Sequence, residues 1–162
     1  MVDMHLVNKV SDELKKHHVT IATAESCTGG LLAHTLTNVS GSSEYFDQGI
    51  ISYSNKAKME LLGVSKELLE RYGAVSKEVA TAMAKGIQQR ASVDYGLATT
   101  GIAGPTGGTK DKPVGLVFIG LSMNETVVVK EFRFMGDRLI NKESACTEAL
   151  KLLLEMISDR KS

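Results

Sequence analysis

Segments with the apolar spacing of amphipathic helices alternate along this chain with short β-branched segments, and no linker-like stretch separates them. The strand patterns lie at residues 19–24, 45–54, 94–101, 114–122 and 125–134. The last two flank Met123 and Asn124 as the strands of a hairpin would. Helix and strand in alternation, followed by a late hairpin, predict an α/β fold. We expect a three-layer α/β/α sandwich on a mixed sheet, in a single domain over residues 1–162.

The helix boundaries carry their own signals. The helix that opens at GGLLAHTL is expected to end near residues 41–43, where the chain reads GSS. A short helix after Asn55 should close at Gly63, since glycine is favoured just past a helix end. Ser65 and Ser76 are placed to cap two further helices, because serine accepts the free N–H groups of a first turn.

Charge and cysteine content exclude several classes of function. Lys and Arg together number 19, as do Asp and Glu, so the chain offers no basic footprint for nucleic acid or membrane. Cys27, Cys146 and four scattered histidines make neither a disulfide framework nor a zinc site. The first residues lack the pattern of a signal peptide, and the longest apolar run, VGLVFIGL, is too short to span a bilayer. We therefore expect a cytoplasmic protein that binds small molecules or proteins.

Three polar segments follow predicted strands: ESCTGG, SYSNK and TTGIAGPTGG. In open α/β sheets, ligands bind beyond the carboxyl ends of the strands. The three segments are therefore expected to converge on one site.

The segment ESCTGG admits a nucleophile or a simple helix cap. A serine or cysteine before a helix N-terminus lies near N–H groups that can stabilise an oxyanion, and Gly29 and Gly30 would let a substrate approach the backbone. Ser26 or Thr28 could instead serve only as an N-cap. Cys27 is the rival nucleophile, and since neighbours in an extended segment alternate, only one of Ser26 and Cys27 should face the site.

The segment SYSNK could supply a base. Tyr53 and Lys56 are three residues apart, and Lys56 would lie near the start of its helix. A lysine acts as a base only when burial or a neighbouring positive charge lowers its pKa. A strand-end aromatic and a solvated lysine explain the same pattern.

The segment TTGIAGPTGG is neither a Walker A loop nor a dinucleotide fingerprint, because it lacks the Gly-Lys-Ser/Thr ending and leads toward a strand. Its glycines, with Pro105 and the hydroxyls of Thr99, Thr100 and Thr106, still make a donor-rich loop that could hold a phosphate or a ribose.

In combination, several motifs resemble a known family. They are AESCTGGLL, a Gly-x-x-x-Tyr-Ser-Asn-x-x-Lys-like run (Gly49, Tyr53, Ser54 and Asn55, with Lys56 and Lys58 following), LLGV, GAVSKEVA, MAKG, TTGIAGPTGG and KPVGLVFIGL. Their order and spacing, from about Leu6 to Leu154, resemble the C-terminal domain of CinA-type competence/damage-inducible proteins. That domain also occurs alone as nicotinamide-nucleotide amidohydrolase.

The resemblance implies hydrolysis of the carboxamide of nicotinamide mononucleotide to nicotinate mononucleotide and ammonia, in pyridine-nucleotide salvage, with no metal or organic cofactor. It implies Ser26 as nucleophile, Lys56 as base and Tyr53 as a supporting hydroxyl. The implied substrate contacts are Thr28, Gly29, Gly30, Thr100, Gly101, Ala103, Gly104, Pro105, Thr106, Gly107 and Gly108.

Two further points follow from the resemblance. The family often has an arginine shortly after its Gly-Asp-Arg segment, and Asn141 is interpreted as occupying that place. Arg138, within the segment itself, is then the arginine that remains here. A homo-oligomer is expected, with a dimer as the first candidate. Two alternatives stay open: a water-only mechanism in which Lys56 and Tyr53 orient the water, and a non-catalytic module that binds a nucleotide or docks to a recombination protein.

Overall fold

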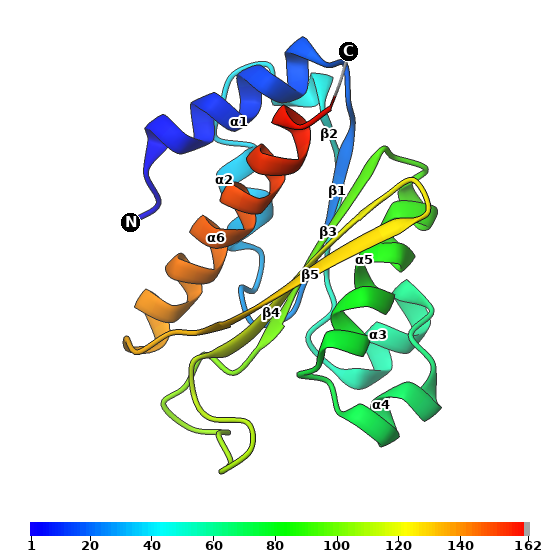
Figure 1. Cartoon of the computed structure of the whole chain (residues 1–162), viewed down its shortest axis with the longest axis vertical. Helices are drawn as coiled ribbons and strands as arrows, with labels where there is room; N and C mark the ends of the chain where they lie inside the picture. The colour runs from blue at the N-terminus through cyan, green and yellow to red at the C-terminus, as the bar shows by residue number, and fades with distance from the viewer. Residues whose placement is uncertain (161–162) are drawn as a thin grey trace.

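One five-stranded mixed sheet organises the computed structural model, which describes residues 1–160 (Figure 1). The strands are β1 (Ile21–Glu25), β2 (Phe46–Ile51), β3 (Tyr95–Gly101), β4 (Leu116–Met123) and β5 (Thr126–Arg133), in the order β2-β1-β3-β4-β5. β1 pairs in parallel with β2 and β3, whereas β3, β4 and β5 pair antiparallel. The predicted α/β fold on a mixed sheet is confirmed.

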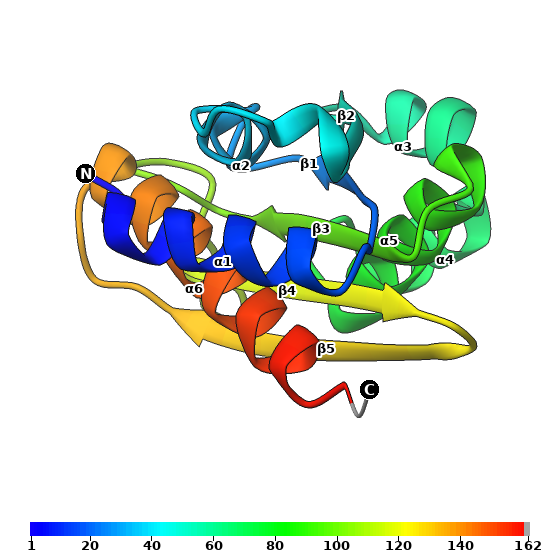
Figure 2. The same ribbon diagram turned by 90° about the horizontal axis from the view of Figure 1, so that it is seen from above.

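Helices cover both faces of this sheet. α1 (Met4–Lys16), α2 (Leu31–Leu36) and α6 (Arg138–Ser158) lie on one face, and α3 (Asn55–Leu62), α4 (Lys66–Tyr72) and α5 (Lys77–Ala91) lie on the other (Figures 1 and 2). Each interface has its own apolar core. Leu14, Leu97 and Leu153 belong to the core under α1 and α6, and Val79, Met83 and Ile87 belong to the core under α5.

The predicted helix caps at Ser65 and Ser76 and the predicted helix end at Gly63 are confirmed. Ser65 and Ser76 accept N–H groups in the first turns of α4 and α5, and Gly63 closes α3 with φ of 69°. The second helix is shorter than predicted. α2 ends at Leu36, and a separate 3-10 turn, η1 (Ser42–Glu44), precedes β2.

The parallel strands end together, which brings the three polar segments to one edge of the sheet. Glu25 at the end of β1 pairs with Ile51 of β2 and with Thr99 of β3. Ser26 therefore follows β1 between the ends of its two neighbours. This register brings the three polar segments that follow β1, β2 and β3 close to one another, as expected.

Candidate active site

Ser26 extends β1 by one residue before the chain turns into α2. Its N–H donates to the carbonyl of Thr99 at 3.0 Å, which continues the parallel pairing, and the residue is 8% exposed. Ala24 faces the core beneath α5. Because side chains alternate along an extended segment, Ser26 points to the same side of the sheet, where α3 lies.

Lys58 of α3 meets Ser26. Its Nζ donates to Ser26 Oγ at 3.1 Å, to the carbonyl of Ser52 at 2.9 Å and to the carbonyl of Tyr53 at 3.2 Å. The residue is 1% exposed, and within residues 1–160 no carboxylate forms an ion pair with it. Burial lowers the pKa of the Lys58 ammonium below its ordinary value, because desolvation disfavours the charged form.

The lysine chosen from the sequence is therefore corrected from Lys56 to Lys58. The Lys56 side chain is 78% exposed and its ammonium pairs with Glu60 at 3.9 Å, one turn along the solvent face of α3. Ser54 caps α3 by accepting the N–H of Ala57, which fixes where the helix begins. The signal was present in the sequence, since the run Tyr-Ser-Asn-x-x-Lys reaches its lysine at Lys58 and not at Lys56.

The hydroxyl of Tyr53 pairs with Arg138 and not with Ser26. The residue is 59% exposed, and its Oη accepts a hydrogen bond from Arg138 Nη2 at 3.1 Å. Among residues 1–160 its hydroxyl makes no hydrogen bond to Ser26. What reaches the buried pair is its main-chain carbonyl, which accepts from Lys58.

The side chains of Ser26 and Cys27 lie on opposite sides of the strand. Cys27 is 6% exposed and belongs to the core under α1 and α6, on the opposite side of the strand from Lys58. Desolvation raises the pKa of the Cys27 thiol to about 12. A buried thiol of that kind is not an activated nucleophile.

Neither Ser26 nor Thr28 caps α2, so the simple capping interpretation is wrong. The N-cap position is Gly30, with φ of 100°. The buried carboxylate of Glu25, which the sequence analysis did not select, accepts the N–H groups of Leu32 at 2.8 Å and Ala33 at 3.0 Å. Thr28 Oγ1 donates to the same carboxylate at 2.6 Å, so this hydroxyl proton is already used.

The turn leaves other donors free. Among residues 1–160, no hydrogen bond uses the N–H groups of Cys27, Thr28 or Gly30. Gly29 also has a positive φ, of 59°, which favours glycine in the turn. Backbone N–H groups next to a nucleophile are the usual donors to an oxyanion. Thr28 thus keeps a main-chain N–H that is free within the described residues, while its hydroxyl proton is used within the fold.

The glycine-rich loop, residues 102–115, is anchored from two sides. Before it, Thr100 is 1% exposed and its hydroxyl donates to the carbonyl of Ala74, so the expected substrate contact by this hydroxyl proton is not available. Within it, Arg138 Nη1 donates to the carbonyl of Gly104 at 2.7 Å. The segment from Pro105 to Gly108 stays exposed and keeps its expected role as a prediction.

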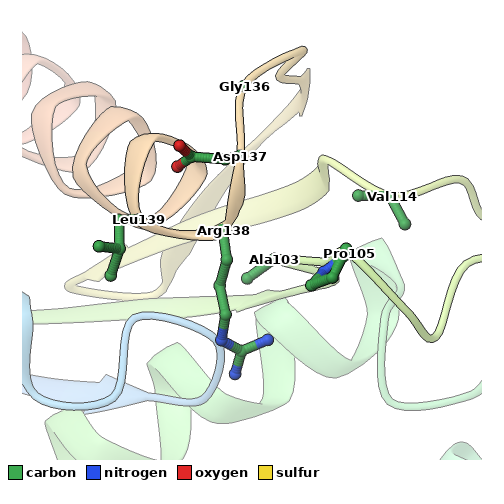
Figure 3. A pocket seen from close by; sticks show the side chains of 7 residues that line it. All are labelled: Ala103, Pro105, Val114, Gly136, Asp137, Arg138 and Leu139. Carbon is green, nitrogen blue, oxygen red and sulfur yellow. The ribbon is translucent and has the colours of Figure 1, made fainter.

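A cavity of about 400 Å³ opens between the loop and the start of α6. Its walls are Ala103, Pro105, Val114, Gly136, Asp137, Arg138 and Leu139 (Figure 3). Ser26 and Lys58 do not line it. Arg138 connects the two regions, because its guanidinium points away from α6 and reaches Tyr53.

Two cations of α6 lie at this end of the molecule without carboxylate partners among residues 1–160. One is Arg138, whose hydrogen bonds go to Gly104 and Tyr53. The other is Lys142. A methyl group placed on Gly29 would lie 3.4 Å from Lys142 Nζ, so this ammonium sits against the turn that carries Ser26. No local sequence pattern predicts Lys142, because its place depends on how α6 docks.

Residues 1–160 hold neither a metal-binding cluster nor a membrane-spanning helix. That range contains no cluster of three or more His, Cys, Asp and Glu side chains arranged to hold a metal ion. None of its helices has the length and apolar character needed to cross a membrane.

Comparison with known proteins identifies the family. The model of the CinA C-terminal domain matches residues 3–157. This chain belongs to the CinA C-terminal domain family. A CinA-like protein from Chloroherpeton thalassium is 48% identical over 160 residues, which are 96% of this chain and 38% of the relative. A CinA-like protein from Kosmotoga olearia is 57% identical over 125 residues, which are 77% of this chain and 30% of the relative.

Solved structures have the same fold as this CinA domain. The competence damage-inducible protein A of Klebsiella pneumoniae superposes with a TM-score of 0.94 at 32% identity, over 97% of this chain and 98% of that one. The competence/damage inducible protein CihA of Agrobacterium tumefaciens gives 0.91 at 38% identity, over 94% and 93%. The chain spans only about a third of the length of the curated relatives above, so their whole-protein activities are not transferred.

Proposed function

We propose that this CinA domain hydrolyses the carboxamide of nicotinamide mononucleotide to nicotinate mononucleotide and ammonia. One observation carries the proposal: the hydrogen bond of 3.1 Å between Lys58 Nζ and Ser26 Oγ, at a lysine that is 1% exposed. A binding module would not need a hydroxyl paired with a buried, uncompensated lysine. Amide hydrolysis needs a nucleophile and a base that can later return its proton, and this pair offers both.

In the proposed reaction, neutral Lys58 takes the proton of Ser26 as Oγ bonds to the amide carbon. The tetrahedral oxyanion accepts hydrogen bonds from the free N–H groups of the turn, and Lys58 then protonates the departing nitrogen. Ammonia leaves as the C–N bond breaks, and an ester to Ser26 remains. Water attacks this ester as Lys58 takes its proton. Lys58 then returns that proton to Ser26 Oγ as the ester bond breaks, which releases the acid and restores the serine.

The two carbonyls around Lys58 orient its amine for this role. A neutral amine has two N–H groups and one lone pair. The carbonyls of Ser52 and Tyr53 are the natural acceptors for the two N–H groups. The lone pair is then directed at the third neighbour, Ser26 Oγ, which is the direction required of a base.

Recognition of the phosphate is assigned to the start of α6 and to the glycine-rich loop. The chain has no net positive charge, so an anionic substrate depends on local groups. Arg138 and Lys142 supply two positive charges at this end of the molecule, and the exposed loop residues Gly107 and Gly108 add backbone donors.

The direct test is ammonia release from nicotinamide mononucleotide, compared with nicotinamide and with the riboside. We expect turnover of the mononucleotide and a large loss of kcat/KM for the two compounds without phosphate. Binding of the mononucleotide without any ammonia would support the binding module instead. Detection of the Ser26 ester by intact mass in rapidly quenched samples distinguishes covalent catalysis from direct attack by water.

Replacement of Gly104 by alanine is expected to raise KM for the mononucleotide about tenfold with a smaller change in kcat. Gly104 has φ of 87°, and an added Cβ would overlap the side chain of Val114, so the loop must move. An alanine at that φ is strained by roughly 1–2 kcal/mol. Gly41→Ala is the matched control, since Gly41 has φ of 84° and lies beside η1, away from the site. Unchanged KM in Gly104→Ala would remove the loop from substrate binding.

Two further properties remain predictions. A homo-oligomer, with a dimer as the first candidate, is tested by light scattering of the purified protein. A cytoplasmic location is tested by fractionation of the source cells.

A further inference from the structure

The carboxamide of Asn141 is buried between the start of α6 and the glycine-rich loop. The residue is 1% exposed, its Oδ1 accepts the N–H of Gly136 at 2.9 Å, and its Nδ2 donates to the carbonyl of Ala103 at 3.0 Å. The side chain thus joins two segments that are far apart in sequence. Because it is buried and both of its polar atoms are paired within the fold, this side chain is not available to bind a ligand.

Asn141 does not act on the loop alone. Arg138, three residues earlier on the same helix, donates to the carbonyl of Gly104, next to the carbonyl taken by Asn141. Residues three apart lie on the same face of a helix. One face of α6 therefore holds two consecutive carbonyls of the loop. Asp137 caps this helix by accepting the N–H of Ile140 at 2.9 Å.

The chemistry of the two contacts requires an amide at this position. One partner is a donor and the other an acceptor, and a short side chain that both accepts and donates is asparagine. A leucine would leave a buried N–H and a buried C=O unpaired, at a cost of about 1–3 kcal/mol each. An ionised aspartate would keep the bond to Gly136 but turn an acceptor toward the carbonyl of Ala103.

We propose that Asn141 is a positioning residue that fixes the glycine-rich loop on α6 and thereby sets the place of Arg138 in the substrate site. Its effect on substrate rests on the proposed function, whereas its effect on the loop does not. The Ser26–Lys58 pair is held by other elements, β1 and α3, and stays in place when the loop loosens. Loss of Asn141 should consequently weaken binding of the mononucleotide more than it slows the chemical steps.

The experiment compares Asn141→Asp and Asn141→Leu with the wild type at pH 6 and pH 8. Amide hydrogen exchange is measured at Gly136 and across residues 102–115, and KM and kcat are measured for the mononucleotide. At pH 8 we expect faster exchange in both segments and KM about tenfold above wild type, with kcat within about twofold.

The pH dependence separates positioning from a general loss of stability. A buried carboxyl beside a carbonyl has its pKa raised, and the protonated acid regains a donor toward Ala103. The ratio of the Asn141→Asp KM to the wild-type KM should therefore fall toward one at pH 6. The Asn141→Leu ratio should not change with pH. Asn124→Asp, in the exposed β4–β5 turn, is the control and should match wild type in both measurements.

Each outcome decides a separate claim. Wild-type exchange rates in the loop of both variants would overturn the inference. Faster exchange with unchanged KM would overturn the positioning role. A third outcome is faster exchange in the folded variants together with no ammonia release from the mononucleotide by the wild-type protein. That outcome would support the loop contact and reject the proposed function. If Asn141→Leu fails to fold, Asn141→Asp at the two pH values decides the question alone.

Discussion

Lys58→Arg is expected to lower kcat by about 10³-fold while ligand affinity is kept within a few-fold. Arginine preserves the positive charge but does not give up its proton near neutral pH, so a base is lost. Lys56→Arg is the matched control, because Lys56 is solvent-exposed on the same helix, and it should leave kcat unchanged. Steady-state ammonia release measures kcat, and equilibrium dialysis with the mononucleotide measures affinity.

The wild-type pH profile tests the same assignment. Burial lowers the pKa of Lys58, so the neutral amine becomes populated at lower pH than for an ordinary lysine. The rate should rise with pH through this lowered pKa and then level off. A rate that does not depend on pH in the range below the ordinary lysine pKa, or full turnover in Lys58→Arg, would exclude Lys58 as the base.

Ser26→Ala is expected to reduce kcat by roughly 10⁴-fold or more, because the covalent route disappears while the rest of the site is retained. Circular dichroism and thermal unfolding should show a folded protein. Cys27→Ala is the matched control at the next position. It should cost about 1 kcal/mol of stability by removing a buried thiol, with turnover preserved. Loss of turnover in Cys27→Ala alone would reverse the assignment of the nucleophile, and turnover in Ser26→Ala would favour direct attack by water.

Local signals predicted the framework of the site. The alternation of patterns gave the layered sheet, and the rule that strands of such a sheet end together predicted the convergence around Ser26. The choice between Ser26 and Cys27 could be framed from alternation but not decided, because it depends on which face of β1 each helix covers.

The misplaced lysine has a simple physical source, which is the phase of a helix relative to its neighbours. Lys56 and Lys58 differ by about 200° around α3 at 100° per residue, so a slip of two residues moves a cation from the core to solvent. Glu25 was overlooked because an acid at a strand end usually faces water, whereas here the start of α2 folds back over it. Asn141 and Lys142 depend on the docking of α6, which no local pattern encodes.

The carboxylate of Glu25 already occupies the N-terminus of α2, and this matters for what leaves the site as well as for what enters. A helix N-terminus normally attracts anions, but here its first donors are taken and its partial charge is balanced by a buried acid. In the proposed reaction, the N-terminus of α2 therefore offers no further anion site, either to the phosphate of the substrate or to the newly formed carboxylate of the product. Retention of either anion depends instead on the cations Lys58, Arg138 and Lys142.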